Sequence, residues 1–466
     1  MGNFQPRIAI AALKGGSGKT VFSLGLTAAW RQKDFRVSPF KKGPDFIDAA
    51  WLSLAAGRSC HNLDSFMMTD VQIIRSFLEN SADSDLSLIE GNRGLYDGLD
   101  TDGCCSTAEL AKLLRCPVVL IVDVTMVTRT AAALVLGCQQ LDRELNLSGV
   151  ILNRVAGLRQ ETLVKDSIEK YCGLPVLGSV PKLKEDPFPE RHMGLIPHQE
   201  RGQADRAIEW ARTTVEKHID TKAFWRLAQE AGALPEDRFL EERRLGDRVA
   251  DAPPRIGYIL DRAFWFYYPE NLALLEKMGA NLVEINALED KDLPPIDALY
   301  VGGGFPETQA RALADNRIFR ESLKMRIEAY LPVYAECGGL LYMGEHLLVE
   351  GKSYPMVGAL PLDFSMGKKP QGHGYTILEV THDNPYYPTG EILRGHEFHY
   401  SRPLKDESTE IPSVFKMIRG KGLDGQRDGF CRKNLLATYT HIHAAGNTSW
   451  GENFFKAALL HKKSKQ

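Results

Sequence analysis

A glycine-rich loop between an apolar segment and a helical pattern constrains the fold of this chain more than any other feature. Residues 7–12 read RIAIAA, residues 14–20 read KGGSGKT, and apolar side chains follow at helical spacing over residues 20–30. A loop that joins a strand to the N-terminus of a helix presents backbone N–H groups and the positive end of the helix dipole to an anion. This segment therefore predicts a strand–loop–helix unit suited to phosphate.

The side chains of this loop match the needs of a nucleoside triphosphate. Lys19 can bridge the β and γ phosphates, and the Thr20 hydroxyl can ligate Mg²⁺. Leu13 stands where the strict phosphate-loop pattern requires glycine, so a strand–helix turn without nucleotide is the alternative interpretation. The residues that we expect to bind nucleotide here are Gly15, Gly16, Ser17, Gly18, Lys19 and Thr20.

The pattern of apolar segments predicts an α/β chain of two domains. Strand-like segments in the first half lie at residues 36–40, 86–90, 117–123, 148–153 and 175–180, with helical patterns between them, such as 106–114 and 128–141. Apolar strands alternating with helices are typical of a doubly wound parallel sheet covered on both faces. We therefore predict a first domain over residues 1–235.

A charged segment closed by two prolines separates the two predicted domains. Residues 236–254 carry both charge signs and end in Pro253 and Pro254, which favours an exposed linker. Strand-like segments then resume at residues 255–260, 281–285, 298–302, 331–335 and 435–440. These predict a second α/β domain over residues 255–466.

Three acidic residues follow strands of the first domain. Asp45 and Asp48 come after the strand that ends near residue 40, and Glu90 ends the strand over residues 86–90. Ligands of an open parallel sheet bind at the carboxyl ends of its strands, so these carboxylates should face Lys19. We predict Thr20, Asp48 and Glu90 as Mg²⁺ ligands. For each acid alone, a solvated loop carboxylate or a helix N-cap is the alternative.

A cysteine in the second domain lies where a strand meets a helix. Cys337 follows VYAE and precedes GGL, which is typical of a nucleophile elbow in which the helix N-terminus favours the thiolate. The histidines in THIH offer a base; we favour His441, although His443 has the same strand parity. Residues 302–304 are glycines that could supply a second N–H donor to an oxyanion. A small buried hydrophobic residue is the alternative interpretation of Cys337.

Composition excludes several function classes. With 57 basic and 60 acidic residues the net charge is −3, which gives no long-range attraction to nucleic acid. No segment has the length and apolarity to span a bilayer, and no secretory signal is recognisable. The eight cysteines form no CxxC pair, which favours reduced thiols. We expect a cytoplasmic protein that binds neither nucleic acid nor membrane; a homodimer stays open.

Taken together, these motifs resemble the cobyrinate a,c-diamide synthase family of glutamine-dependent amidotransferases over nearly the whole chain. The resemblance implies a phosphate-loop synthetase domain like that of dethiobiotin synthetase, followed by a class I glutaminase domain. The matching segments, in family order, are SGKT (17–20), PFKKGPD (39–45), NLD (62–64), EG (90–91), GLYDG (94–98), RHMGL (191–195), FPE (305–307), AECGG (335–339) and YTHIH (439–443).

The resemblance also implies roles for individual residues. Lys19 and Thr20 would handle the phosphates of ATP, whereas Asp45, Asp48 and Glu90 would serve Mg²⁺ and carboxylate activation. Further along the chain, Asp97 would lie near the substrate, and Asn153 resembles the adenine-reading asparagine of related nucleotide domains, with an ordinary turn residue at a strand end as the alternative. In the second domain, Cys337 and His441 would hydrolyse L-glutamine.

The implied reaction is ATP- and glutamine-dependent amidation of the a and c acetate carboxylates of cobyrinate through an acyl phosphate, in cobalamin biosynthesis. Phe46, His61 and Asn92-Arg93 depart from the family pattern around the expected substrate side, so siroheme or nickel-sirohydrochlorin is the alternative tetrapyrrole. Lys14 resembles the signature lysine of ParA and MinD partitioning ATPases, which suggests a nucleotide-switched ATPase as an alternative of a different class. Basic residues proposed for the macrocycle's carboxylates are Lys41, Lys42, Arg58, His61, Arg93, Arg191 and His192.

Overall fold

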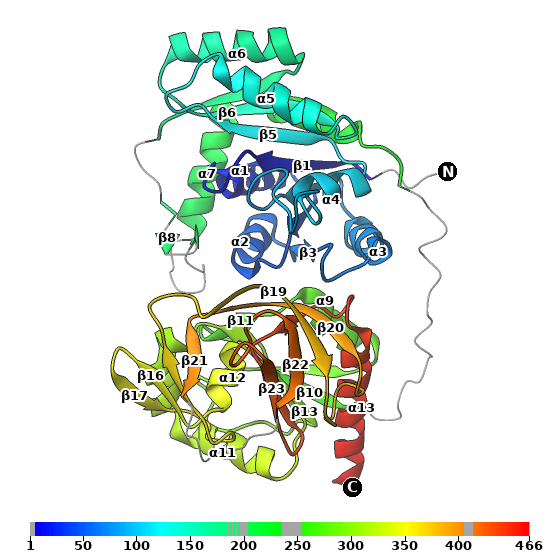
Figure 1. Ribbon diagram of the computed structural model, residues 1–466, viewed down its shortest axis with the longest axis vertical. Helices are drawn as coiled ribbons and strands as arrows, with labels where there is room; N and C mark the ends of the chain where they lie inside the picture. The colour runs from blue at the N-terminus through cyan, green and yellow to red at the C-terminus, as the bar shows by residue number, and fades with distance from the viewer. Residues whose placement is uncertain are drawn as a thin grey trace. The chain divides into compact units, whose positions relative to one another are not determined.

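The computed structural model describes residues 5–183, 187–188, 190–191, 194–195, 204–234, 253–404 and 413–465. The chain forms two compact units, Met1–Glu241 and Glu242–Gln466 (Figure 1). Of the predicted linker, only residues 253–254 lie within the described residues, so its limits stay a prediction. Among the residues that the structure describes, no helix has both the length and the apolarity to cross a membrane.

The first unit contains a sheet of seven strands that all run parallel. Across the sheet the strands are β3 (His61–Leu63), β2 (Val37–Lys42), β4 (Leu86–Glu90), β1 (Arg7–Ala12), β5 (Val118–Asp123), β6 (Leu147–Val155) and β7 (Val176–Pro181). The helices are α1 (Lys19–Arg31), α2 (Phe46–Ala56), α3 (Asp70–Ser81), α4 (Thr107–Leu113), α5 (Thr130–Leu141), α6 (Leu158–Cys172), α7 (Ala204–His218) and α8 (Thr221–Gln229). A short pair, β8 (Glu190–Arg191) and β9 (Gly194–Leu195), stands apart. The predicted doubly wound parallel architecture is confirmed.

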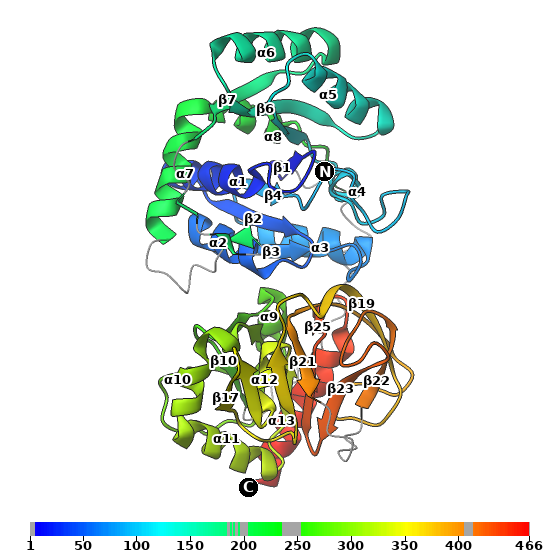
Figure 2. The ribbon, with the colours of Figure 1, turned by 60° about the vertical axis from the view of Figure 1, so that its left-hand side comes forward.

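Helices cover both faces of this sheet (Figure 2). On one face, apolar side chains of α1, α7 and α8, including Phe22, Val215 and Phe224, form one core with the sheet. On the other face, Phe40 of β2 contacts Phe77 of α3, with ring centroids 5.0 Å apart. Burial of both faces explains why the strands read as continuous apolar segments. The phosphate loop therefore lies at the end of a strand that is central in the sheet.

The second unit contains a sheet of ten strands, parallel in one half and antiparallel in the other. Across the sheet the strands are β12 (Asn281–Ile285), β10 (Arg255–Ile259), β13 (Ala298–Val301), β15 (Val333–Glu336), β24 (Leu435–Thr438), β23 (Arg427–Arg432), β22 (Ser413–Arg419), β19 (Gly372–Val380), β20 (Ile392–His399) and β25 (His441–Ile442). The predicted strands form the parallel half. The antiparallel half was not predicted.

Helices also flank this second sheet on both faces. Side chains of β15 alternate, so that Val333 and Ala335 join a core with α11, whereas Tyr334 joins a core with α13. The helices of this unit are α9 (Pro269–Lys277), η2 (Pro306–Gln309), α10 (Ala310–Asp315), α11 (Arg317–Glu328), α12 (Gly338–Met343) and α13 (Thr448–Ser464). Two small sheets complete it, one of β11 (Phe264–Phe266) with β14 (Gly303–Gly304), the other of β17 (Lys352–Pro355), β16 (His346–Val349), β18 (Asp363–Met366) and β21 (Ser401–Leu404).

Candidate active sites of the two units

The phosphate loop joins β1 to α1 and leaves open space above its glycines. A Cβ atom on Gly15 or Gly16 would meet no atom within 4 Å. Gly18 caps α1 with φ 95°, a left-handed conformation that side chains rarely adopt. A Cβ there would lie 2.9 Å from Nδ2 of Asn153. The loop thus combines glycine-dependent backbone with room for an anion at the start of a helix.

Lys19 and Thr20 begin α1 and reach toward neighbouring strand ends. The Lys19 side chain is buried, and its Nζ donates to the carbonyl oxygen of Arg93 at 2.7 Å. Burial lowers the pKa of Lys19, and the nearby positive charge of Lys41 lowers it further. The Thr20 hydroxyl donates to Oε1 of Glu90 at 2.9 Å. The structure therefore brings Thr20 and Glu90 together, as the proposed metal site requires.

A buried lysine lies between the predicted carboxylates. Nζ of Lys41 donates to Oδ2 of Asp48 at 2.6 Å and to Oε1 of Glu90 at 2.6 Å. Burial alone would lower the pKa of Lys41, but the carboxylates of Asp48 and Glu90 outweigh it and raise that pKa. Lys41 is 1% exposed, so our assignment of it to a bulky ligand's carboxylates is wrong. It instead neutralises the acids of this site.

Asp45 is a helix cap that also lies next to the predicted metal-site carboxylates. It caps the N-terminus of α2 by accepting from the backbone N–H of Asp48 at 2.9 Å, and it lies beside the charged cluster. Burial and the neighbouring Asp48 carboxylate raise the pKa of Asp45 to about 6. The residue that caps α2 therefore has a carboxyl group that takes up a proton more readily than an ordinary aspartate.

The oxygen atoms of this cluster fit a Mg²⁺ ion. Oε2 of Glu90 is buried without a hydrogen-bond partner, while its other oxygen already accepts from Thr20 and Lys41. Carboxylate and hydroxyl oxygens are the ligands that this hard cation prefers. Asp48 is also within the cluster, although one of its oxygens pairs with Lys41. The unpaired oxygen of Glu90 is the position at which a cation would compensate a buried charge.

Two further predicted residues lie beside the loop. The exposed Asp97 accepts from the backbone N–H of Gly94 at 2.8 Å, and its charge acts on Lys19. Nδ2 of Asn153 donates to the carbonyl oxygen of Ser17 at 2.9 Å. Asn153 lies in β6, near its C-terminal end, and its hydrogen bond to Ser17 places it beside the loop that would hold the phosphates.

The other basic residues proposed for the macrocycle, where the structure describes them, lie in different environments. Lys42 is buried, and Arg58 pairs with Asp83 at 2.7 Å. His192 and the side chain of Arg191 lie outside the described residues. Arg93 is exposed, and its backbone is in the left-handed conformation, with φ 50°. Because its carbonyl oxygen contacts Lys19, this departure from the family pattern lies at the phosphate side as well, which corrects our assignment of it to the substrate side alone.

The second unit places Cys337 at a sharp turn between β15 and α12. Its φ of 48° and ψ of −98° are strained for a residue with a side chain. A Cβ on Gly338 would lie 3.0 Å from the backbone nitrogen of Gly304, so the turn packs directly against the glycine segment. This is the elbow predicted from sequence, in which the N–H of Gly338 acts on the thiol and the Gly338 Cα packs against the backbone of Gly304.

Burial dominates the electrostatics of this thiol. The Cys337 side chain is buried, which raises its pKa, and the charge of Glu307 raises it further; the N–H of Gly338 opposes both effects. The α12 helix has only six residues. Our expectation that a helix N-terminus favours the thiolate is therefore wrong for the free chain, in which the neutral thiol is favoured.

His441 lies against the same glycine segment. A Cβ on Gly303 would overlap Cε1 of His441 and would lie 3.1 Å from Nε2. Nδ1 of His441 contacts Oε2 of Glu336 at 3.1 Å, and both residues are 1% exposed. Since Gly338 packs against Gly304, residues 303–304 connect the histidine to the elbow. His441 and the turn that carries Cys337 therefore both pack against residues 303–304.

His443 lies in a different environment. Its Nε2 is 3.5 Å from Oε2 of Glu270, and its Nδ1 accepts from the backbone N–H of Ala445 at 3.2 Å. Its ring contacts Tyr268, with centroids 4.8 Å apart. These neighbours belong to α9 and to the loop before α13 rather than to the elbow, which favours His441 over His443 as the partner of Cys337.

Sequence reasoning missed Asp428, a fully buried acid on β23. Its carboxylate accepts from the hydroxyl groups of Thr438 and Thr440 and from the backbone N–H groups of Tyr439 and Thr440. These residues directly precede His441, so Asp428 holds the segment that delivers the histidine. Burial raises the pKa of Asp428, and the hydrogen bonds oppose that shift.

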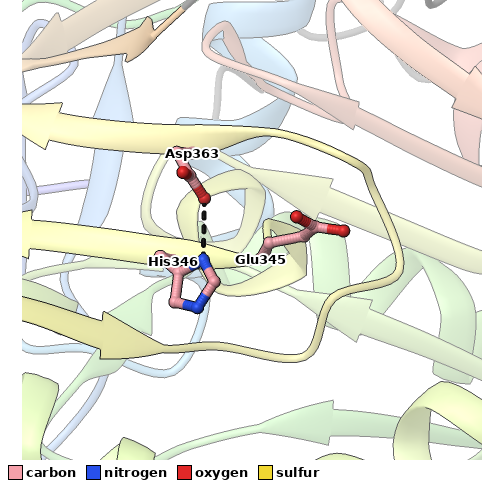
Figure 3. Close-up of side chains that lie close together, drawn as sticks. All are labelled: Glu345, His346 and Asp363. Atoms are coloured by element: carbon pink, nitrogen blue, oxygen red, sulfur yellow. Dashed lines mark hydrogen bonds and ion pairs between the residues drawn. The ribbon is translucent and has the colours of Figure 1, made fainter. Parts of the chain in front are cut away.

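A separate cluster of metal-type side chains lies on the four-stranded sheet (Figure 3). Glu345, His346 and Asp363 offer ligand atoms within 4.8 Å of one another, and Nδ1 of His346 contacts Oδ1 of Asp363 at 2.9 Å. Glu345 is exposed, and the side chains of His346 and Asp363 are 43% and 42% exposed. An exposed ion pair of this kind is common on protein surfaces, and we assign no metal to it.

Family models and curated proteins match both units of this chain. Residues 8–196 match the CobQ/CobB/MinD/ParA nucleotide binding domain, and residues 255–449 match the CobB/CobQ-like glutamine amidotransferase domain. Cobyrinate a,c-diamide synthase from Magnetococcus marinus is 41% identical, over 96% of this chain and 95% of that protein. The enzyme of that name from Archaeoglobus fulgidus is 40% identical, over 98% of each chain.

The chain belongs to the cobyrinate a,c-diamide synthase family. The resemblance predicted from sequence is confirmed, and with it the combination of a nucleotide-binding domain and a glutamine amidotransferase domain. Members of this family are glutamine-dependent ligases, so the two sites above are the places to look for nucleotide chemistry and for release of nitrogen from glutamine.

Proposed function

We propose that the chain uses ATP and L-glutamine to amidate the a and c acetate carboxylates of cobyrinate, a step of cobalamin biosynthesis. The observation that carries this proposal is identity of about 40%, spread over both units, with enzymes named for that reaction. The two sites supply what the reaction needs, because one is suited to phosphate and acidic groups and the other contains a buried cysteine and histidine.

A carboxylate must be activated before ammonia can attack it, because its charge repels nucleophiles and its oxide is a poor leaving group. In our proposal a carboxylate oxygen of the substrate attacks the γ-phosphorus of ATP, the bond to the β–γ bridging oxygen breaks, and ADP leaves with that electron pair. Lys19 and the loop N–H groups, including those of Gly15, Gly16 and Gly18, stabilise charge on the transferring phosphoryl group. Mg²⁺, held by Thr20, Asp48 and Glu90, would supply further charge neutralisation.

The glutaminase half would supply ammonia. The sulfur of Cys337 attacks the carboxamide carbon of glutamine, and the carbon–nitrogen bond breaks as ammonia leaves with a proton from His441. Water then hydrolyses the thioester to glutamate and restores the thiol. Ammonia attacks the acyl phosphate, forms the amide and releases phosphate. Gly338 and Gly304 present the N–H groups suited to the oxyanion.

The test of the substrate is a direct comparison. The protein is incubated with ATP, Mg²⁺ and glutamine against cobyrinate, hydrogenobyrinate, siroheme and nickel-sirohydrochlorin, and the products are analysed by mass spectrometry. We expect the diamide of cobyrinate as the main product, since each amidation replaces a hydroxyl by an amino group. Amidation of siroheme or nickel-sirohydrochlorin in preference would instead select the alternative tetrapyrrole.

A nucleotide-switched ATPase of the ParA and MinD kind is the competing class. Lys14, the residue that suggests it, has a largely exposed side chain whose Nζ lies 3.9 Å from Asp123. A nucleotide-switched ATPase would have no use for a cysteine and a histidine such as Cys337 and His441. ATP hydrolysis stimulated by DNA or lipid vesicles, rather than by a tetrapyrrole, would favour this class.

A further inference from the structure

Glu336 is a buried acid next to the candidate nucleophile of the glutaminase unit. It is the last residue of β15 and directly precedes Cys337. β15 lies in the interior of the ten-stranded sheet, between β13 and β24, and the Glu336 side chain is 1% exposed. A carboxylate so deeply buried persists only when neighbouring groups compensate its charge.

Three neighbouring groups compensate the negative charge of the Glu336 carboxylate. Oε2 contacts Nδ1 of His441 at 3.1 Å and accepts from the hydroxyl of Tyr300 at 3.2 Å, while Oε1 accepts from the backbone N–H of Ile442 at 3.4 Å. Asn271 in turn donates to the Tyr300 hydroxyl at 3.2 Å. Burial raises the pKa of Tyr300 well above its usual range, so this hydroxyl remains a donor. The carboxylate is therefore fixed in orientation.

The surroundings of His441 leave its two nitrogens in different environments. Nδ1 faces Glu336, whereas Nε2 lies on the side of the ring that packs against Gly303. His396 stacks on His441 with centroids 5.0 Å apart, and burial lowers the pKa of His396 well below its usual range, so this neighbour is neutral. Glu336 is thus the charged group that acts on Nδ1.

We propose that Glu336 is the positioning residue for His441, which it holds with the proton on Nδ1 and with Nε2 directed to the thiol of Cys337. This inference rests on the proposed glutaminase activity and adds a third member to its machinery. Because the acid precedes the nucleophile in the chain, one elbow would fix the cysteine and the acid together. When His441 takes the proton of Cys337 on Nε2, the Glu336 carboxylate stabilises the resulting imidazolium without accepting a proton itself.

The Glu336→Gln variant tests this role with little change in shape. The amide NH₂ of glutamine can donate to Nδ1 and thereby favour a proton on Nε2, which removes the base. In Ser–His–Asp enzymes the equivalent change costs about 10⁴ in kcat. We expect kcat for glutamine hydrolysis to fall by about 10²- to 10⁴-fold. The KM for glutamine should change by less than about threefold, because uniform binding is untouched.

Glu270→Gln is the matched control. Glu270 lies 3.5 Å from Nε2 of His443, so this variant alters a second buried glutamate–histidine pair in the same unit without touching the elbow. We expect it to retain wild-type kcat for glutamine. For both variants, synthesis driven by high ammonium should match the wild type, which shows that the fold and the synthetase site are intact.

Several results would overturn the role of Glu336. These are a Glu336→Gln variant that keeps more than about a tenth of wild-type kcat, an equal loss in Glu270→Gln, or a parallel loss of ammonium-driven synthesis. If Glu336→Gln does not fold, ¹⁵N spectra of histidine side chains in the wild-type protein decide the matter, with His441→Gln to assign the signal. A proton on Nδ1 is expected, and a proton on Nε2 contradicts the proposal. A wild-type protein that forms no glutamate refutes the proposed function instead.

Discussion

The two candidate sites differ in how the backbone surrounds the reacting groups. In the phosphate loop, a Cβ on Gly15 or Gly16 would enter open space, so these glycines serve an incoming anion. In the glutaminase unit, a Cβ on Gly303 would overlap His441, so that glycine serves a contact already made. The backbone of the first site therefore leaves open space beside its glycines, whereas the second site depends on close approach of the backbone to a side chain.

The two sites also differ in how completely their buried charges are compensated. Lys41 neutralises Asp48 and Glu90, and one oxygen of Glu90 still has no hydrogen-bond partner. In the glutaminase unit the Glu336–His441 pair is supplemented by neutral donors, and the thiol of Cys337 is kept protonated by burial. The first site thus keeps a buried carboxylate oxygen without a hydrogen-bond partner, as our proposed Mg²⁺ site requires, whereas the carboxylate of the second site is fully paired.

The largest expected effect comes from Lys19→Ala. Because Lys19 would stabilise the transferring phosphoryl group, its loss should abolish synthesis from both glutamine and ammonium. Product formation and ADP release are measured together. The matched control is Lys33→Ala, an exposed residue just after α1, which should behave as wild type. AMP as the nucleotide product of the wild-type protein would contradict the acyl-phosphate route.

Cys337→Ala should separate the two sites. Removal of the nucleophile should abolish glutamate release and glutamine-driven amidation, whereas high ammonium should still support amidation at the wild-type rate. Both rates are measured on the same preparation, with the half-buried Cys431 changed to alanine as the control. Loss of ammonium-driven synthesis as well would show that the two centres are not independent.

Glycine-to-alanine changes test the contrast in backbone packing. Gly303→Ala should displace His441 and lower kcat for glutamine by about 10²-fold, since a displacement of about 1 Å can cost that much. Gly15→Ala meets no neighbouring atom and should shift the melting temperature by no more than about 2 °C. If Gly303→Ala and Gly15→Ala changed activity at their own sites and the melting temperature to the same extent, the contrast in backbone packing would be refuted.

Lys41→Met should destabilise the first unit, because it leaves the buried carboxylate of Glu90 and the half-buried carboxylate of Asp48 without their cation. Removing one partner of a buried ion pair typically lowers the free energy of unfolding by about 3–5 kcal/mol. Lys112→Met, which removes the partly exposed pairs with Glu109 and Asp142, should cost about 1 kcal/mol or less. Denaturant unfolding without nucleotide measures both, and equal losses would refute a neutralising role for Lys41.

The smallest effect concerns the pH dependence of thiol reactivity. Since burial raises the pKa of Cys337, the reactive thiolate fraction in the free protein should grow with pH, by about tenfold per pH unit and without a plateau below about pH 9. The rate of iodoacetamide labelling at Cys337, followed by peptide mass spectrometry, tests this. A plateau near neutral pH would mean that the thiolate already forms without glutamine.

Local signals made the first site easier to predict than the second. The phosphate loop, its lysine and its threonine lie within one short segment, so the strand–loop–helix pattern alone predicts their shared position. The strand β2 was predicted over residues 36–40, but it continues through Lys42. Burial of Lys41 depends on acids contributed by α2 and β4, and Lys42 lies near Asp64, which no local pattern reveals.

The glutaminase site depends more on tertiary contacts. Cys337 could be predicted from its elbow, and Glu336 next to it could have been singled out as well, but its contact with His441 spans 105 residues. Asp428 meets the segment before His441 only because β23 pairs with β24. Short polar strands such as β17, which lies in the four-stranded sheet, carry no continuous apolar pattern, which is why they were missed.

The most direct test of coupling between the two sites is to follow the nitrogen of glutamine into the amides of the tetrapyrrole product. The protein is supplied with cobyrinate, ATP, Mg²⁺ and amide-¹⁵N glutamine, and the product amides, glutamate and ADP are quantified together. We predict ¹⁵N in the cobyrinate amides, with one glutamate and one ADP formed for each. Absence of the label from the product, or product formation without glutamate, would contradict the coupling of the two sites.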